Sequence, residues 1–168
     1  MIKLSLYLAT LLLGSNFSAT TAPKTPAEGG LSTTLVEQRF LDRVGSERLA
    51  RHLRKLEVNP ILAEVAREHS LEMWRKDYFD HISPTPEMKT PMTRYLKRLG
   101  RTPKWARLGE NLFYCSIVDP DRGHKCLMSS ATHRENILDD QYEQIGVGAY
   151  VSPDGRLWVT QLFLTQKD

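Results

Sequence analysis

The first half of the chain has the spacing of apolar residues that is typical of amphipathic helices. Val36, Phe40 and Val44 open a series that continues to Leu56. This recurrence at three to four positions places the apolar side chains on one face. Residues 35–56 therefore predict a first helix.

Proline and glycine mark the ends of two further helices. Pro60 suits the first turn of a helix that we expect to run to Lys76. Pro91 opens a third helix and Gly100 closes it. On the second helix, His69 falls on the apolar face. We expect it to be a hydrogen-bonded packing residue rather than a metal ligand.

The last segment carries the clearest strand pattern. Residues 144–151 and 157–163 read as strands and flank the turn pair Asp154-Gly155, which predicts a β-hairpin. Because helices come first and paired strands last, we expect an α+β fold in which helices cover an antiparallel sheet.

Three shorter elements are predicted between the helical half and the hairpin. Residues 111–114 indicate a strand, and residues 121–130 indicate a short helix. Thr132 and Glu135 have the three-residue separation of a capping box, which predicts the start of another helix.

The N-terminus has the layout of a secretory signal peptide. Lys3 supplies a positive charge, residues 4–14 form an uncharged apolar run, and small and polar residues follow to Ala22. About a dozen apolar residues are fewer than the roughly 20 that span a bilayer. We therefore favour a cleaved signal over an uncleaved membrane anchor, and expect a secreted or periplasmic protein with no stable membrane insertion after cleavage.

These boundaries divide the chain into three parts. We expect a signal peptide over residues 1–22 and a flexible tether over residues 23–34, which are rich in Pro, Gly, Ser and Thr. The remaining residues, 35–168, have the usual length of one domain.

The charges are nearly balanced. The chain has 23 Lys and Arg against 20 Asp and Glu, a net charge of +3. Residues 1–22 contribute only Lys3, so the remainder carries 22 minus 20, or +2. This balance alone gives no basis for nucleic-acid binding. We expect the basic residues of the first helix to form a solvated surface. They are Arg48, Arg51, Arg54 and Lys55.

Cys115 and Cys126 are the two cysteines of the chain. In an exported protein such a pair is most simply a disulfide. The alternative is a zinc site in which His124 joins both thiols. That alternative lacks a fourth ligand and the spacing of common zinc modules.

In three segments, ionisable residues stand next to residues that are typical of loops and turns. They span residues 78–84, 109–112 and 130–138. Taken singly, each histidine or glutamate in them is compatible with an ordinary loop or helix-start residue. Their order along the chain is more informative than any one of them.

The ordered segments resemble the CAP superfamily of cysteine-rich secretory proteins, antigen 5 and plant pathogenesis-related 1 proteins, and most closely its shorter bacterial branch. The likeness extends over most of residues 56–163. The matching positions are Met73, Tyr78 to Pro84, Gly109 to Asn111, Ser130 to Leu138, Ile145 to Gly148 and Thr160 to Phe163.

The resemblance implies a three-layer α-β-α sandwich with a central antiparallel sheet. It also implies an open cleft that brings together His81, His133 and Glu110. Two neutral imidazoles are good ligands for zinc or copper, and zinc is the metal we expect. The carboxylate would either ligate the metal or hydrogen-bond to an imidazole and orient it. Three further residues are expected to support the cleft. They are Asn111, Ser130 and Asn136.

One cleft residue of many eukaryotic members has no counterpart in this chain. Those members carry a second glutamate on the helix that corresponds to residues 121–130, where this chain has none. The nearest acids are Asp119 and Asp121. The full set of two histidines and two glutamates is therefore not expected.

Three functions follow from this interpretation. The first, which we favour, is a binding module whose cleft takes a metal and a small or lipidic ligand or an extracellular partner. The second is a metal-dependent hydrolase with Glu110 as general base. The sequence has no His-Glu-x-x-His motif to support it. The third is an interaction protein of the cell envelope in which the cleft has no role.

Overall fold

The computed structural model describes residues 32–168. The predicted signal peptide and residues 23–31 of the predicted tether lie outside the described residues. The helices are α1 (Thr33–Leu49), α2 (Pro60–Arg75), the 3-10 turn η1 (Pro86–Met88), α3 (Pro91–Leu99), α4 (Pro120–Ser129) and α5 (Ala131–Leu138). The strands are β1 (Glu57–Val58), β2 (Trp105–Cys115), β3 (Gln144–Val151) and β4 (Leu157–Lys167).

The strands form one sheet in the order β1-β3-β4-β2. The hairpin of β3 and β4 is antiparallel, and β2 pairs antiparallel with β4 along its whole length. The short strand β1 instead runs parallel to β3. The predicted antiparallel sheet is therefore correct for the three long strands and wrong for β1, which makes the sheet mixed. The outer strand β2 is one edge of the sheet.

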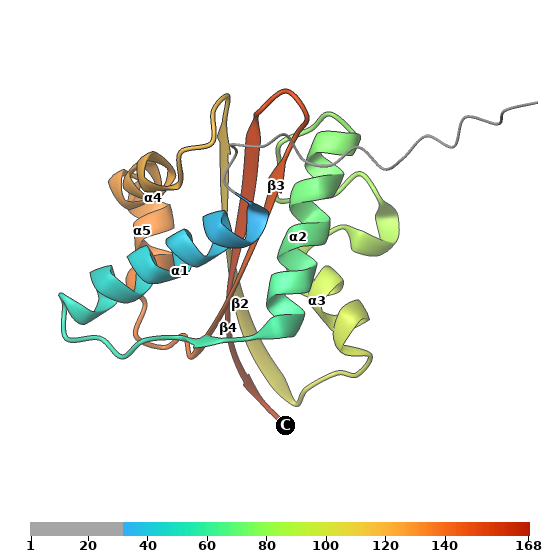
Figure 1. Ribbon diagram of the computed structural model, residues 1–168. Helices are drawn as coiled ribbons and strands as arrows, with labels where there is room; N and C mark the ends of the chain where they lie inside the picture. The colour runs from blue at the N-terminus through green and yellow to red at the C-terminus, as the bar shows by residue number, and fades with distance from the viewer. Residues whose placement is uncertain (1–31) are drawn as a thin grey trace, which may run out of the picture.

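Helices cover both faces of the sheet, as the sandwich prediction requires (Figure 1). On one side lie α1, α4 and α5, and on the other lie α2 and α3. Alternate residues of β2 face opposite layers. Phe113 joins the core cluster with Phe40 of α1, whereas Leu108 joins the cluster with Leu62 of α2. Successive residues of this edge strand can therefore serve different sides of one site.

The second and third helices begin and end where the sequence predicted. The Asn59 side chain accepts hydrogen bonds from the first backbone amides of α2, and Thr90 does the same for α3. Gly100 closes α3 in the left-handed conformation, with φ 72°. These polar caps satisfy amides that have no partner within a helix.

The first helix is shorter than predicted. It ends at Leu49 because His52 adopts a left-handed conformation, with φ 59°, and the Leu53 amide bonds back to the Arg48 carbonyl. Arg48 is also not part of a solvated surface. It is fully buried and donates to the carbonyls of Arg54, Ile137 and Asp139.

Two later predictions also need correction. The strand predicted over residues 111–114 extends over the whole of β2, because β4 is long enough to pair with all of it. The capping box predicted at Thr132 is absent. Helix α5 instead begins at Ala131 after Ser130, whose side chain makes no capping hydrogen bond.

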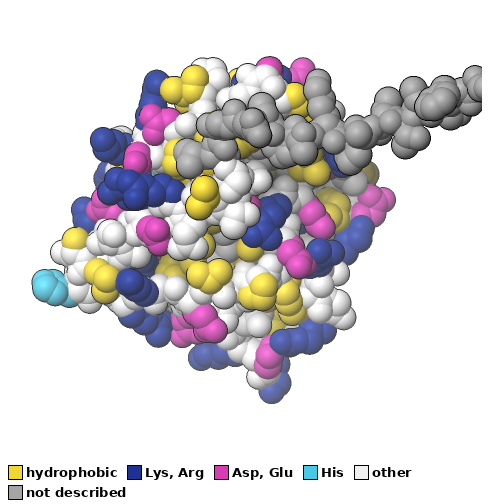
Figure 2. All heavy atoms as spheres, viewed as in Figure 1, with side chains coloured by type: hydrophobic (Ala, Val, Ile, Leu, Met, Phe, Trp, Pro, Cys, Tyr) yellow, Lys and Arg dark blue, Asp and Glu magenta, His cyan; other side chains and the backbone are white. Residues whose placement is uncertain are grey.

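Figure 2 shows the face of the molecule that is turned to the viewer in Figure 1. Basic and acidic side chains are interspersed over this face. Neither sign gathers into a broad patch there. The distribution matches the small net charge of the chain.

Candidate functional site

The three residues carried over from the motifs lie on three different elements around β2. His81 is in the loop that follows α2, Glu110 is on β2, and His133 is in the first turn of α5. The loop and α5 approach β2 from the two helical layers. The site therefore forms around the edge strand of the sheet, with contributions from both helical layers.

Glu110 is the centre of a buried ion-pair arrangement. Its side chain is only 3% exposed, and its Oε1 lies 2.8 Å from the Nδ1 of His81. Its Oε2 accepts a hydrogen bond of 2.6 Å from the Nη2 of Arg94, whose side chain is 1% exposed. Both carboxylate oxygens are therefore occupied by protein partners.

Arg94 is the site residue that the sequence interpretation missed. It lies on α3, and its other terminal nitrogen, Nη1, donates to the carbonyls of His81 and Met88. The guanidinium thus binds the carboxylate of Glu110 and the backbone of the loop that carries His81. Arg94 holds the acid and the imidazole in one arrangement.

Glu72 anchors the loop that carries His81 to helix α2. Its Oε1 accepts from the hydroxyls of Ser83 and Thr85, and its Oε2 accepts from the hydroxyl of Tyr78. Partial burial tends to raise the pKa of Glu72. The hydrogen bonds from Thr85, Lys76, Tyr78 and Ser83 outweigh it and lower that pKa to about 2. The loop is therefore fastened to α2 by a carboxylate that must stay ionised.

This anchoring predicts acid sensitivity. A depressed folded-state pKa gives stability that is complete above the ordinary pKa of 4.5 and is lost as the pH falls towards 2. At pH 7 we expect Glu72→Gln to lower the free energy of unfolding by about 1–2 kcal/mol, allowing for the partial exposure of the carboxylate. Urea unfolding at pH 7 and at pH 2 measures this. A difference between wild type and variant that is the same at both pH values would contradict the prediction.

On the opposite face of β2, two asparagines join the strand to α5. The Nδ2 of Asn111 donates to the His133 carbonyl at 3.0 Å. The Nδ2 of Asn136 lies 2.9 Å from the Asn111 Oδ1 and 3.3 Å from the Glu110 carbonyl. These bonds fix the backbone of α5 at His133 against the strand that carries Glu110.

Other residues considered in the sequence lie away from this arrangement. Ser130 sits at the junction of α4 and α5, where its Oγ lies 3.3 Å from the Oγ1 of Thr132. Asp119 caps α4, and Asp121 pairs with Arg39 and Arg43 of α1. Neither aspartate replaces the second glutamate of the eukaryotic cleft.

His69 has the packing role that its position on α2 predicted. It is fully buried, and its Nε2 lies 3.1 Å from the Asp80 carbonyl. Burial lowers the pKa of His69 and keeps the ring neutral. The ring supports the start of the loop that leads to His81.

His81 and His133 differ in their electrostatic surroundings. The hydrogen bond to Glu110 raises the pKa of His81, against the opposing effect of its partial burial. Burial lowers the pKa of His133, and the charge of His81 lowers it further. Of the two rings, His133 therefore loses its proton at the lower pH, and its neutral form has a lone pair available for a metal or a hydrogen-bond donor.

The side chains at this site suit a metal ion held by two imidazoles better than one held by two imidazoles and a carboxylate. In residues 32–168 no three His, Cys, Asp or Glu side chains are grouped closely enough to hold a metal ion. Each oxygen of Glu110 already has a protein partner, so a metal at Glu110 would compete with Arg94 or His81 for the carboxylate. As a hydrogen-bond acceptor for His81 Nδ1, it already has the position of a residue that orients an imidazole.

The cysteines do not form the expected disulfide. Both are free in the structure. Cys115 packs against the main core cluster from the end of β2, whereas Cys126 is exposed on α4, so the two thiols face different surroundings. The alternative zinc site with His124 is absent as well, since the described part of the chain holds no such three-residue group.

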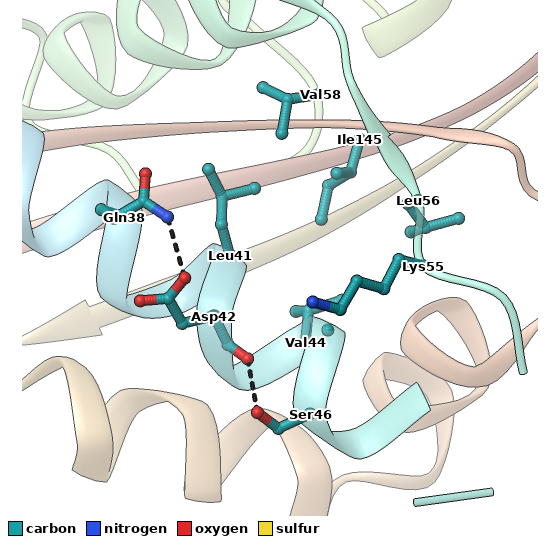
Figure 3. Close-up of a pocket in the computed structure, with 10 residues that line it drawn as sticks. Gln38, Leu41, Asp42, Val44, Ser46, Lys55, Leu56, Val58 and Ile145 are labelled. Atoms are coloured by element: carbon teal, nitrogen blue, oxygen red, sulfur yellow. Dashed lines mark hydrogen bonds between the residues drawn. The ribbon is translucent and has the colours of Figure 1, made fainter. Parts of the chain in front are cut away.

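A separate hollow lies at the other edge of the sheet, between α1 and the segment that contains β1 (Figure 3). Leu41, Val58 and Ile145 point into it, and Asp42 accepts a hydrogen bond of 2.8 Å from Gln38 at its rim. Since β1 and β2 are opposite edges, this hollow is not part of the histidine site.

Comparison with known proteins identifies relatives over most of the chain. The model of the cysteine-rich secretory protein family (CAP) matches residues 41–163. The uncharacterized protein YkwD of Bacillus subtilis (strain 168) is 35% identical over 130 residues, which is 77% of this chain and 48% of YkwD. The chain spans about half or less of the length of the curated relatives it matches.

Solved structures show the same fold. An extracellular SCP-domain protein from Bacillus anthracis gives a TM-score of 0.70 at 28% identity, over 88% of this chain and 45% of that one. An outer surface protein from Borrelia burgdorferi gives 0.68 at 19% identity, over 82% and 97%. Among residues 32–168, no helix is long and apolar enough to cross a membrane. This chain belongs to the cysteine-rich secretory protein (CAP) family, as its motifs predicted.

Proposed function

We propose that this chain is an exported CAP-domain binding protein whose cleft holds a divalent metal, with zinc the expected ion, and beside it a small or lipidic ligand or part of an extracellular partner. One observation carries the proposal. Glu110, held by Arg94, accepts from the Nδ1 of His81 and so leaves Nε2 of that half-exposed ring for a ligand. Export is supported by the N-terminal segment and by relatives described as extracellular or outer-surface proteins.

The residues that would hold the ion are His81, through Nε2, and His133. Imidazole nitrogens suit zinc, and a carboxylate behind one of them raises its basicity as a ligand. A bound zinc ion would supply a Lewis acid with coordination positions left for a ligand atom. Asn111 and Asn136 hold α5 in place, which keeps His133 at the edge of β2.

The hydrolase alternative has less support from the geometry. A general base needs a carboxylate oxygen that can take a proton from water. Both oxygens of Glu110 are already engaged, one by His81 and the other by the buried cation Arg94. We therefore assign Glu110 a positioning role and favour binding without turnover.

Zinc titration calorimetry tests this proposal. We expect the signal-free protein to bind one zinc ion, and His81→Ala/His133→Ala to bind at least about tenfold more weakly, since both imidazoles are removed. His52→Asn is the matched control, because His52 is exposed just after the end of α1 and asparagine tolerates its left-handed conformation. Equal affinity in wild type and the double variant would contradict the proposal, as would an absence of zinc binding by the wild type.

A further inference from the structure

A pocket of about 240 Å³ is lined by residues at the ends of α2 and β2 and at the start of β4. These three ends lie at one end of the sheet (Figure 1). Four aromatic side chains line the pocket, namely Tyr78, Phe79, Tyr114 and Trp158. Asp77 and Arg156 also contribute to its lining. Met73, Tyr78 and Phe79 are family-motif positions that also line this pocket, but the function proposed for the histidine site does not use it.

Phe79 and Tyr114 form an exposed aromatic pair beside the buried ring of Trp158. Phe79 and Tyr114 are 50% and 42% exposed, and their ring centroids are 6.2 Å apart. Trp158 is 5% exposed, and its ring centroid lies 4.9 Å from that of Tyr114. It packs in a core cluster with Met73. Large aromatic surfaces left open to water in a concave site are typical of ligand pockets.

The charges around the pocket argue against an ionic ligand. Arg156 lies over the ring of Trp158, 5.1 Å from its centroid, so the position that a ligand cation would take is already filled. The Nε of Arg156 is 2.8 Å from Asp154, and Asp77 adds a further negative charge to the lining. An anion therefore meets an arginine that is already paired and a second acid.

What remains is a neutral ligand with a ring-shaped apolar face and many hydrogen-bonding groups. The carboxylate of Asp77 accepts hydrogen bonds, and the guanidinium of Arg156 donates them. Aromatic rings offer a flat surface for stacking. We propose that this pocket binds a sugar ring of a neutral carbohydrate, with the apolar face of the sugar packed on the exposed surface of the Phe79 and Tyr114 pair.

The sugar pocket is separate from the histidine site and does not depend on metal binding there. Tyr114 follows Glu110 by four residues on the same face of β2, a separation of about 13 Å along a strand. Phe79 precedes His81 by two residues in one loop. A chain of sugars could therefore extend from this pocket towards the cleft.

Amide and indole NMR spectra of the metal-free protein test the proposal. The probes are methyl glycosides of glucose, galactose, mannose and N-acetylglucosamine, and disaccharides of each, at millimolar concentration. We expect at least one sugar to shift the Trp158 indole signal, with an affinity independent of salt because the ligand is neutral. Phe79→Ala and Tyr114→Ala should each weaken it about tenfold. Trp105→Ala, an equally exposed aromatic at the other end of β2, should leave it unchanged.

Three results would overturn the proposal. One is that no probe sugar moves the Trp158 indole. Another is that the shift persists in both Phe79→Ala and Tyr114→Ala. The last is that choline or inorganic phosphate displaces the sugar or binds in its place. Because both variants replace exposed side chains, unchanged amide spectra elsewhere would show that the fold is intact.

Discussion

Replacing Arg94 by methionine is expected to lower the free energy of unfolding by about 3–5 kcal/mol, because it leaves a buried carboxylate without its cation. The Nη2 of Arg94 lies 2.6 Å from Glu110, and the two side chains are 1% and 3% exposed. In the variant, Glu110 would retain only His81 as a charge partner. Urea unfolding at pH 7 measures the loss.

A double variant shows whether the cost comes from the unpaired charge. Arg94→Met/Glu110→Gln removes the uncompensated carboxylate, and we expect it to recover about 1–3 kcal/mol relative to Arg94→Met alone. Arg98→Met on the same helix is the matched control. Its ion pair with Glu64 is exposed and should be worth less than about 1 kcal/mol. Strictly additive losses in the double variant would contradict the assigned role of Arg94.

Replacing Gly148 by alanine is expected to lower the free energy of unfolding by more than about 3 kcal/mol. Gly148 lies on β3 directly beneath α2, and a Cβ there would overlap the backbone of Ala66 and Arg67. The Oγ of Ser70 also donates to the Gly148 carbonyl at 2.9 Å. A backbone cannot move aside as a flexible side chain can, so α2 would have to lift from the sheet. Thermal or urea unfolding measures the effect.

Gly45 provides a control for this substitution. A Cβ at Gly45 would meet only the Lys55 side chain, at 3.7 Å, and the residue lies inside α1. We expect Gly45→Ala to raise the free energy of unfolding by about 0.5–1 kcal/mol through helix propensity. A loss of less than about 1 kcal/mol in Gly148→Ala would show that α2 does not pack on β3 as closely as described.

The elements that the sequence predicted well are those with local end signals. Pro60 and Pro91 begin α2 and α3, and Asp154-Gly155 forms the turn of the hairpin. The first helix ends early because His52 adopts the left-handed conformation that glycine usually provides. The burial of Arg48 could not be predicted from the sequence either, since its carbonyl partners at Ile137 and Asp139 are about 90 positions away.

The residues of the candidate site also separate into those that local sequence signals identify and one that they do not. His81, Glu110 and His133 were found because each lies in a recognisable motif. Arg94 was not, because on a short amphipathic helix it resembles the exposed basic residues around it. Its burial depends on Glu110, which comes from a separate strand. Of the two roles expected for the carboxylate, metal ligand or orienting acceptor, its pairing with Arg94 and His81 favours the second.

Nitrogen-15 NMR of the imidazole rings tests the central claim that Glu110 and Arg94 present His81 Nε2 to a ligand. With neutral rings, we predict that His81 carries its proton on Nδ1, facing Glu110, and that zinc shifts the Nε2 signal of His81 together with a ring nitrogen of His133. A His81 ring protonated on Nε2, or histidine signals that zinc leaves unchanged, would contradict the account.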